Sequence, residues 1–283
     1  MKPEVVVRAD ANVGEGPVFD ERTGLLCWVD IVPGLLHQSD VVTGSLVTTE
    51  AGMMLGAAIP RATSPGFAVA VQDGFGFLVD EQLKIVDRAL TRPDLRMNDA
   101  KCDSRGRLWA GSNGLNVESG WGSLHRWDGT SPSTIHMSGL DLPNGIGWSP
   151  DDRLMYLVDS VAGRLMVSKF EADEGHIEGF TTLVAIRQGL PDGLAVGADG
   201  SIFLAIWGGS EVRRYSPDGT LMSTIAMPVA QPSSCAFGAD GILYITSARA
   251  NLSDEQLASQ PLAGSIFAVQ TDTTGAPIWP FAH

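Results

Sequence analysis

An internal repeat of about 43 residues is the feature of this sequence that most restricts its fold. Short β-rich runs recur, each preceded by an Asp or Gly turn: TGLLCWVD (23–30), GFAVAVQDG (66–74), GRLWAGS (106–112), RLMYLVDS (153–160), GSIFLAIW (200–207) and GILYITSA (241–248). Trp109, Tyr156, Phe203 and Tyr244 lie inside four of these runs, 47, 47 and 41 residues apart, and Trp28 precedes Trp109 by 81 residues. No ten-residue helical pattern separates the runs, so the period predicts β-propeller blades of four strands each.

Six blades account for nearly the whole chain. Six repeats need about 258 residues, and the chain has 283. We therefore predict an all-β fold, a single six-bladed β-propeller domain over residues 1–283. Residues 5–7 are expected to pair into the last blade and so remove an exposed sheet edge. One short helix is predicted in LSDEQLASQ, where Ser253 and Gln256 form a capping-box pattern and Pro261 ends it.

Composition excludes several classes of partner. The formal net charge is -14 and no cluster of Lys and Arg stands in the chain, which argues against nucleic acid and anionic membranes. The N-terminus has no apolar signal region and no apolar run approaches 18 residues, so we expect a cytoplasmic protein. Cys27, Cys102 and Cys235 have no disulfide or zinc spacing and are expected to be buried thiols.

The usual catalytic motifs are missing from the sequence. There is no GxSxG, HExxH, EF-hand or P-loop pattern, and the five histidines have no metal spacing. What remains is a set of polar residues in Gly/Pro-containing segments, which we expect in turns just ahead of the blade strands, where the central channel opens. They are Glu15 in NVGEGPVFD, Arg96, Asn98 and Asp99 in LRMNDAKCD, Asn144 in LPNGIGWSPDD, and Asp192 in LPDGLAVGADG.

Three of these residues recur at nearly the same phase of the repeat. Glu15, Asn144 and Asp192 would supply three oxygen ligands, which suit hard divalent cations. Three protein ligands leave coordination positions open for water and substrate, as in a catalytic metal site. The alternative for each residue taken singly is turn chemistry, because Asn-Gly and Asp-Gly are favoured hairpin turns.

At these residues the sequence resembles the gluconolactonase family that includes regucalcin (senescence marker protein), a group of six-bladed propeller sugar lactonases. The resemblance is carried by NVGEGPVFDERTGLLCWVDI, GAAIPRA, RMNDAKCDSRGRLWAGS, LPNGIGWSPDD, LPDGLAV, QPSSCAFGADGILYITSA and PLAGSIFAV. It implies a small-molecule sugar lactone as substrate and one divalent cation held on the axis by Glu15, Asn144 and Asp192. It also implies substrate contacts from Arg96 and Asn98.

The resemblance leaves some assignments open. Asp99 follows in the same motif, with a turn-stabilising role as an equal alternative. Ala100 stands where a glycine is common, and NGLNVESGWG (113–122) replaces a more acidic segment. Trp121 and Trp207 are candidates for the wall of a sugar site, although packing in the core or rim is the favoured alternative for both.

The expected chemistry is the hydrolysis of a lactone with Asp192 as general base, alone or together with the metal. Arg96 and Asn98 would orient the sugar. The residue set accepts Ca²⁺, Zn²⁺, Mn²⁺, Mg²⁺ or Fe²⁺ and chooses neither the lactone nor the oligomeric state. Competing hypotheses are a calcium-binding regulatory protein without turnover, an interaction scaffold, and a metal-dependent hydrolase of another ester or a phosphotriester.

Overall fold

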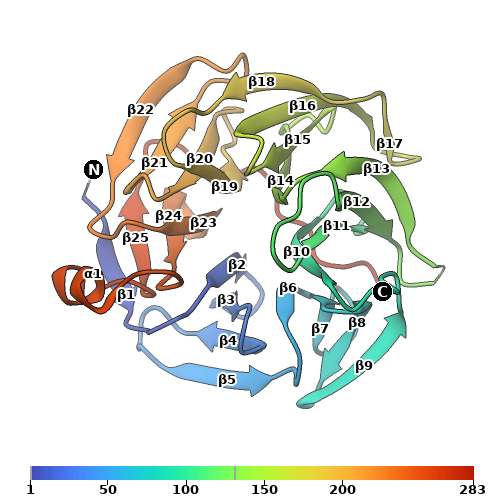
Figure 1. Cartoon of the computed structure of the whole chain (residues 1–283), viewed down its shortest axis with the longest axis horizontal. Helices are drawn as coiled ribbons and strands as arrows, with labels where there is room; N and C mark the ends of the chain where they lie inside the picture. The colour runs from blue at the N-terminus through green and yellow to red at the C-terminus, as the bar shows by residue number, and fades with distance from the viewer. Residues whose placement is uncertain (1, 131) are drawn as a thin grey trace.

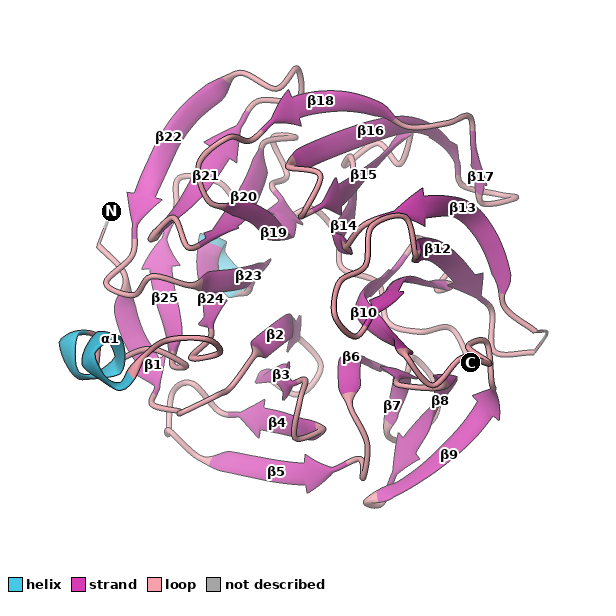
Figure 2. Ribbon diagram, viewed as in Figure 1, coloured by secondary structure: helices cyan, strands magenta, loops and turns pink. Residues whose placement is uncertain are grey.

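Six antiparallel sheets are arranged in a ring around a common axis in the computed structural model, which describes residues 2–130 and 132–283 (Figure 1). Strands make up nearly all of its regular structure (Figure 2). The first strand of each blade lies innermost and the next strands follow outward (Figure 1). The prediction of an all-β six-bladed propeller is confirmed.

The blades follow one another along the chain. Blade 1 contains β2 (Gly14–Asp20), β3 (Leu25–Asp30), β4 (Leu35–Ser39) and β5 (Leu46–Glu50). Blade 2 contains β6 (Leu55–Pro60), β7 (Phe67–Val71), β8 (Gly74–Val79) and β9 (Gln82–Asp87). Blade 3 contains β10 (Leu95–Cys102), β11 (Leu108–Gly114), β12 (Gly122–Trp127) and β13 (Thr134–Leu140).

The second half of the ring has the same order with one addition. Blade 4 contains β14 (Pro143–Trp148), β15 (Leu154–Asp159), β16 (Arg164–Glu171) and β18 (Thr181–Ala185), with the short β17 (His176–Ile177) paired to the end of β16. Blade 5 contains β19 (Leu190–Val196), β20 (Ile202–Trp207), β21 (Glu211–Tyr215) and β22 (Leu221–Ala226). Blade 6 contains β23 (Pro232–Phe237), β24 (Ile242–Ser247), β25 (Ile266–Gln270) and β1 (Glu4–Val7).

The N-terminal strand closes the ring. β1 pairs antiparallel with β25, with Glu4 opposite Ala268 and Val5 opposite Phe267, so the outermost strand of blade 6 comes from the other end of the chain. This confirms the predicted closure and covers a sheet edge that would otherwise be free to pair with another chain. The predicted helix is also present: α1 (Asp254–Ser259) has Ser253 as its N-cap and a capping box with Gln256.

The core is divided among the junctions of the blades. Buried hydrophobic clusters of the described residues lie between blades 1 and 2, 2 and 3, 3 and 4, 4 and 5, 5 and 6, and 6 and 1. The repeated large residues of the sequence fill these junctions, Trp109 between blades 3 and 4 and Tyr156 between blades 4 and 5. Each blade is therefore stabilised by its two neighbours, as in other repeat architectures.

Trp28 departs from this pattern by one residue. In blade 3, Trp109 pairs with Lys101, and the position in blade 1 that corresponds to it is Cys27, which pairs with Val18. Because side chains alternate between the faces of a strand, the shift of one residue turns Trp28 toward the preceding blade, where it packs near Tyr244. The three cysteines are free and buried, as predicted.

A C-terminal strap, residues 272–283, crosses the face of the ring opposite the candidate site. Ala276 donates its N–H to the Val196 carbonyl at 2.8 Å, and Phe281 donates to the Pro60 carbonyl at 2.9 Å. The strap thus joins blade 5 to blade 2, and its red trace ends beside β8 in Figure 1. The buried Phe281 ring stacks on Trp127 with centroids 5.1 Å apart.

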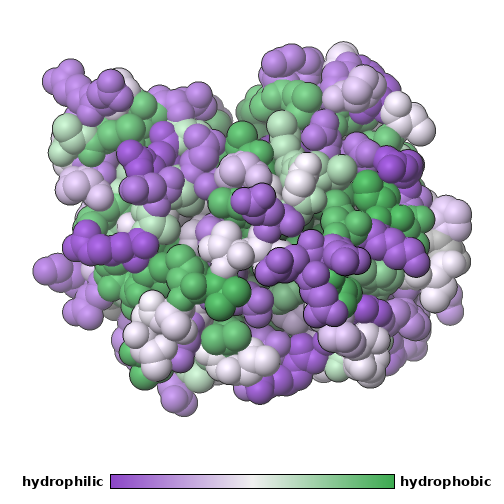
Figure 3. Space-filling view, turned by 90° about the horizontal axis from the view of Figure 1, so that it is seen from below, coloured by the Kyte–Doolittle hydropathy of each residue, from purple (hydrophilic) through white to green (hydrophobic). Residues whose placement is uncertain are grey.

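The outer wall is polar with apolar side chains interspersed, as the side of the ring that carries β5 and β9 shows (Figure 3). Val42 and Val47 are exposed large hydrophobic residues of blade 1. In the part of the chain that the structure describes, no helix has the length and apolar character needed to cross a membrane.

We expect Phe281→Ala to lower the free energy of unfolding by about 3–5 kcal/mol, because it empties a fully buried aromatic site. Urea unfolding followed by tryptophan fluorescence measures the loss. Val42→Ala is the control, since Val42 is 91% exposed and should change stability by less than about 0.5 kcal/mol. Equal stability of the two variants would show that the strap is not anchored by this ring.

Candidate functional site

A cavity of about 320 Å³ opens at the start of the inner strands. All five residues that the sequence singles out as metal ligands or substrate contacts line it: Glu15, Arg96, Asn98, Asn144 and Asp192. They come from blades 1, 3, 4 and 5, and are separated by up to 177 positions in the sequence. The fold therefore brings together groups that are far apart in the chain.

Four of these residues lie in, or directly before, β-bulges of the inner strands, while Arg96 lies in the regular part of β10 ahead of its bulge. Asn98, Asn144 and Asp192 are each the first of two residues that oppose a single residue of the second strand. Glu15 directly precedes the bulge of β2. The prediction of turns ahead of the strands is wrong in this detail. A bulge redirects a side chain without ending the strand, and here it directs polar groups into the channel.

The glycines after Asn144 and Asp192 also have a different role from a hairpin turn. Gly145 and Gly193 are not among the glycines with positive φ. A Cβ atom on Gly145 would lie 2.6 Å from the Asp192 carbonyl oxygen, and one on Gly193 would overlap the Ser234 side chain. Glycine is required here because the inner strands of neighbouring blades approach closely.

Asn144 and Asp192 are in direct contact. The Asn144 side-chain amide donates a short hydrogen bond to Asp192 Oδ1 and a second one to Ser160 Oγ at 3.3 Å. Its Oδ1 atom is buried and has no hydrogen-bond partner. A buried acceptor without a donor carries its full desolvation cost, and a cation would satisfy it.

Burial disfavours the ionised form of the carboxylates in the site and so raises their pKa values. Desolvation, followed by the charge of Asp99, raises the pKa of Glu15 to about 8. Desolvation and the charge of Glu15 raise the pKa of Asp192 well above its ordinary value, while Arg96 opposes this shift. A divalent ion among these groups would offset both effects, since opposite charge favours the ionised form.

The donor set fits a hard cation that accepts carboxylate and amide oxygens. Within residues 2–130 and 132–283, no three His, Cys, Asp or Glu side chains gather closely enough to hold a metal ion. A site at this place therefore depends on the amide oxygen of Asn144 beside Glu15 and Asp192. The unpartnered Oδ1 atom is the observation that favours it.

Arg96 and Asn98 form one unit. Arg96 Nη1 donates to Asn98 Oδ1 at 2.7 Å and to the Met97 carbonyl at 3.1 Å. Asn98 Nδ2 in turn donates to the Pro143 carbonyl at 3.1 Å, which connects blade 3 to blade 4. Burial lowers the pKa of Arg96 to about 10, so it remains a cation at neutral pH.

Asp99 is not among the residues that line this cavity, and its carboxylate stabilises the bulges. The backbone N–H groups of Ala100 and Ile146 donate to it, which joins blades 3 and 4. Of the two alternatives left open for Asp99, a turn-stabilising role does not hold because Asp99 lies inside β10, where it links inner strands. Burial raises the pKa of Asp99, and Lys101 opposes the shift.

Lys101 is a residue that the sequence analysis missed. Its Nζ atom donates to the Leu194 carbonyl at 2.8 Å and faces the charges of Asp99 and Glu15. The corresponding positions three residues after Glu15, Asn144 and Asp192 hold Val18, Gly147 and Ala195. In the sequence, Lys101 could have been noticed because it is the one charged residue among these equivalent positions of the repeat.

The 113–122 segment borders the cavity through Val117, whose φ of 57° is an uncommon backbone conformation for a β-branched residue. Asp141 holds the segment by accepting from Ser119 Oγ at 2.6 Å and the Gly120 N–H at 2.8 Å. Trp207 lines the cavity. Trp121 instead lies under the Arg92 guanidinium, 3.9 Å from ring centroid to Cζ, outside the cavity lining.

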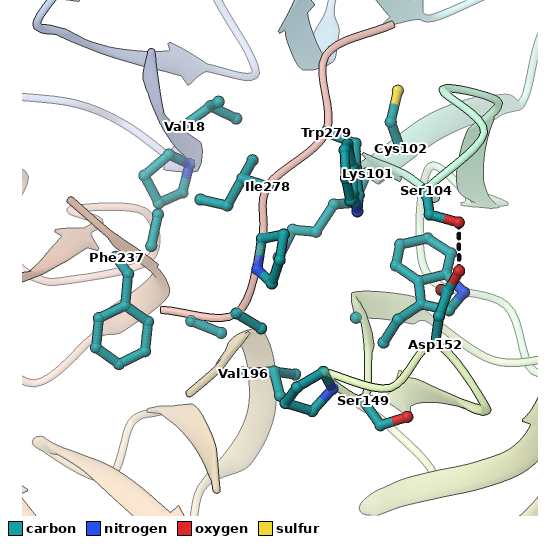
Figure 4. Close-up of a pocket in the computed structure, with 18 residues that line it drawn as sticks. Val18, Lys101, Cys102, Ser104, Ser149, Asp152, Val196, Phe237, Ile278 and Trp279 are labelled. Carbon is teal, nitrogen blue, oxygen red and sulfur yellow. Dashed lines mark hydrogen bonds between the residues drawn. The ribbon is translucent and has the colours of Figure 1, made fainter. Parts of the chain in front are cut away.

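A second, smaller cavity of about 110 Å³ lies beside the C-terminal strap (Figure 4). Ile278 and Trp279 of the strap, Val196, and a hydrogen-bonded pair of Ser104 and Asp152 surround it. A larger hollow of about 470 Å³ follows the strap beside blades 1 and 6. Neither is lined by Glu15, Arg96, Asn98, Asn144 or Asp192, so the 320 Å³ cavity is the candidate site.

Comparison with known proteins agrees with this geometry. A family model described as the SMP-30/gluconolactonase/LRE-like region matches residues 13–249. The chain belongs to this family. It is 33% identical to the 6-deoxy-6-sulfogluconolactonase of Pseudomonas putida over 95% of both chains. It is 32% identical to the L-arabinolactonase of Azospirillum brasilense, over 96% of this chain and 92% of the relative.

A solved structure extends the family relation to three dimensions. The calcium-binding protein regucalcin of Agrobacterium tumefaciens superposes with a TM-score of 0.91 at 28% identity, over 98% of this chain and 96% of that one. The family that the sequence resembles is thus confirmed, and the chain has the same fold as this relative.

The metal-free protein should lose stability as the pH rises from about 4.5 to about 8. Glu15 binds its proton more tightly in the folded state than in the unfolded state. Its contribution to the free energy of unfolding is therefore complete below pH 4.5 and is lost as the pH rises past 8. Urea unfolding in EDTA between pH 5 and 9 measures this fall. Glu15→Gln should make the fall smaller, with the remainder due to Asp99 and Asp192, whereas Glu4→Gln, an exposed control, should leave it unchanged. A fall of equal size in the Glu15→Gln protein would contradict the assignment.

Proposed function

We propose that this protein is a divalent-metal-dependent lactonase that opens a sugar lactone. The observation that carries the proposal is the convergence of Glu15, Asn144 and Asp192, with Arg96 beside them, on one cavity at the channel mouth. The lactonase names of relatives in Pseudomonas putida and Azospirillum brasilense support it. Because those relatives are named for different lactones, the family relation itself leaves the substrate open.

Glu15, Asn144 and Asp192 would hold the metal. When bound, a divalent ion supplies Lewis-acid polarisation of a carbonyl and lowers the pKa of water. Two carboxylates and one amide accept Ca²⁺, Zn²⁺, Mn²⁺, Mg²⁺ or Fe²⁺. The unpartnered Asn144 Oδ1 is the oxygen that such an ion would satisfy.

The residues of the chain have separate tasks in the proposed hydrolysis. Water attacks the lactone carbonyl carbon, the ring C–O bond breaks, and the released alkoxide takes up a proton. Asp192 accepts the proton of the attacking water and returns it to the alkoxide. Arg96 donates hydrogen bonds to substrate oxygens, and Asn98 fixes the direction of its guanidinium from one side.

A second candidate is a calcium-binding protein without turnover. The similarity to regucalcin of Agrobacterium tumefaciens, which is described as a calcium-binding protein, favours it. Calcium binding together with no hydrolysis of any lactone in a panel would support this candidate. Hydrolysis of a phosphotriester or an unrelated ester at a higher rate than any lactone would assign the site to another hydrolase.

Asp192→Ala should reduce kcat by about 10²- to 10⁴-fold, because the proton acceptor is lost, and should weaken metal binding. Arg96→Ala should mainly raise KM. Steady-state hydrolysis followed with a pH indicator separates the two effects. Asp10→Ala and Arg153→Ala are matched controls, since both residues are exposed and their ion pairs contribute little. A metal-replete Asp192→Ala protein with full activity would refute the assignment.

Treatment with EDTA should abolish hydrolysis, and the five candidate metals added singly should restore it to different extents. Metal uptake at pH 7 should release protons, since the Glu15 pKa of about 8 leaves this group largely protonated without metal. Calorimetry in two buffers of different ionisation enthalpy measures the release. Asn144→Leu should abolish both the metal-restored hydrolysis and the proton release, whereas Asn116→Leu, a change at an exposed residue, should retain them. Uptake without proton release would contradict the proposed ligands.

A further inference from the structure

The candidate cavity has two layers of different chemistry. Its floor holds the charged and amide groups of the inner strands. Its wall holds, beside Ser160, Ala250 and the exposed Asn251, seven larger apolar side chains from the strand ends and connections around the mouth: Val13, Ile31, Val117, Leu142, Val161, Leu190 and Trp207. A ligand that reaches the floor therefore passes, and remains in contact with, an apolar collar.

The collar is exposed on the side of blades 4 and 5. Val161 is 46% exposed and Leu190 is 41% exposed, although both line the cavity. Leu190 pairs directly with Trp207 across β19 and β20, so their side chains stand beside each other. Apolar surface that faces water at the mouth of a site favours a ligand that covers it with apolar atoms.

The collar has no means to neutralise an anion. Of the described residues that line the cavity, Arg96 is the one cation, and it lies on the floor. It is already engaged by Asn98 Oδ1 and near the carboxylates of Glu15 and Asp192. A phosphate or sulfonate held at the collar would give up the part of its hydration shell that faces the apolar side chains without gaining a counter-charge, which is costly.

We infer that the substrate is an uncharged lactone whose far end is a deoxygenated or alkyl carbon packed against Leu190, Val161 and Trp207. This inference rests on the lactonase activity proposed above and names the class of lactone. The ester group faces the polar floor, and the far end occupies the collar. The three collar residues determine specificity and take no part in the reaction itself.

Two matched sets of lactones test the inference. One set consists of D-glucono-1,5-lactone, its 6-deoxy analogue and its 6-phosphate, and the other of L-arabinono-1,4-lactone, its 5-deoxy analogue and its 5-phosphate. The ratio of kcat/KM values within the faster set is the readout. We expect the deoxy lactone to exceed the parent by about 10-fold, the effect typical of one group in a hydrophobic pocket, and the phosphate to fall below it by at least as much.

A cation placed in the collar should reverse this order. Leu190→Lys should raise kcat/KM for the phosphorylated lactone and lower it for the deoxy lactone, each by about 10-fold. Val161→Lys tests the same wall from blade 4, so a folding defect of one variant leaves the other. Leu221→Lys is the matched control: Leu221 also belongs to blade 5, is 53% exposed and lies outside the cavity lining.

The outcomes separate this inference from the proposed function. A wild-type preference for the phosphate, or equal rates for the phosphate and deoxy lactones, overturns the inference while the lactonase activity stands. Unchanged ratios in both collar variants do the same. Hydrolysis of neither set overturns the proposed function and the inference with it.

Discussion

The close approach of the inner strands at their bulges is the constraint on which the site depends. Gly145 allows the backbone of blade 4 to touch that of blade 5, and Gly193 allows blade 5 to touch blade 6. With a Cβ at either position the strands would have to separate, and the polar groups at the channel mouth would separate with them. The packing of the ring and the geometry of the cavity are thus set by the same contacts.

This approach forces like charges together in a poorly solvated place. Burial raises the pKa of Glu15, Asp99 and Asp192. The charge of Asp99 adds to the shifts of Glu15 and Asp192, while Arg96 and Lys101 oppose them. Such an arrangement costs stability. It is typical of functional sites, where perturbed pKa values and a cavity occur together. The unpartnered oxygen of Asn144 lowers stability further, and it identifies the place where a bound cation would offset this loss.

Periodicity made the fold predictable, because a blade cannot bury its faces without neighbours and therefore repeats its pattern. The capping box of α1 and the pairing of β1 follow from equally local signals. The convergence of Glu15, Asn144 and Asp192 was predictable because equal phase in a ring means equal distance from the axis. The bulges could not be predicted, because one extra residue in a strand does not change the residue types that the sequence shows there. The repeat pattern treats Trp28 as equivalent to Trp109, although Trp28 is shifted by one residue. On a strand, a shift of one residue moves the side chain to the opposite face of the sheet.

The strap was beyond sequence reasoning, because residues 272–283 carry no strand pattern and bind through backbone groups. Its course has a consequence for how the ring can come apart. Linear arrays of repeats can fray from an end, one unit at a time. In this protein the pairing of β1 with β25 closes the ring, and the strap crosses the ring from Val196 in blade 5 to Pro60 in blade 2. No single junction can widen without pulling on the opposite half of the circle, so the blades are coupled into one cooperative unit despite their repetitive construction.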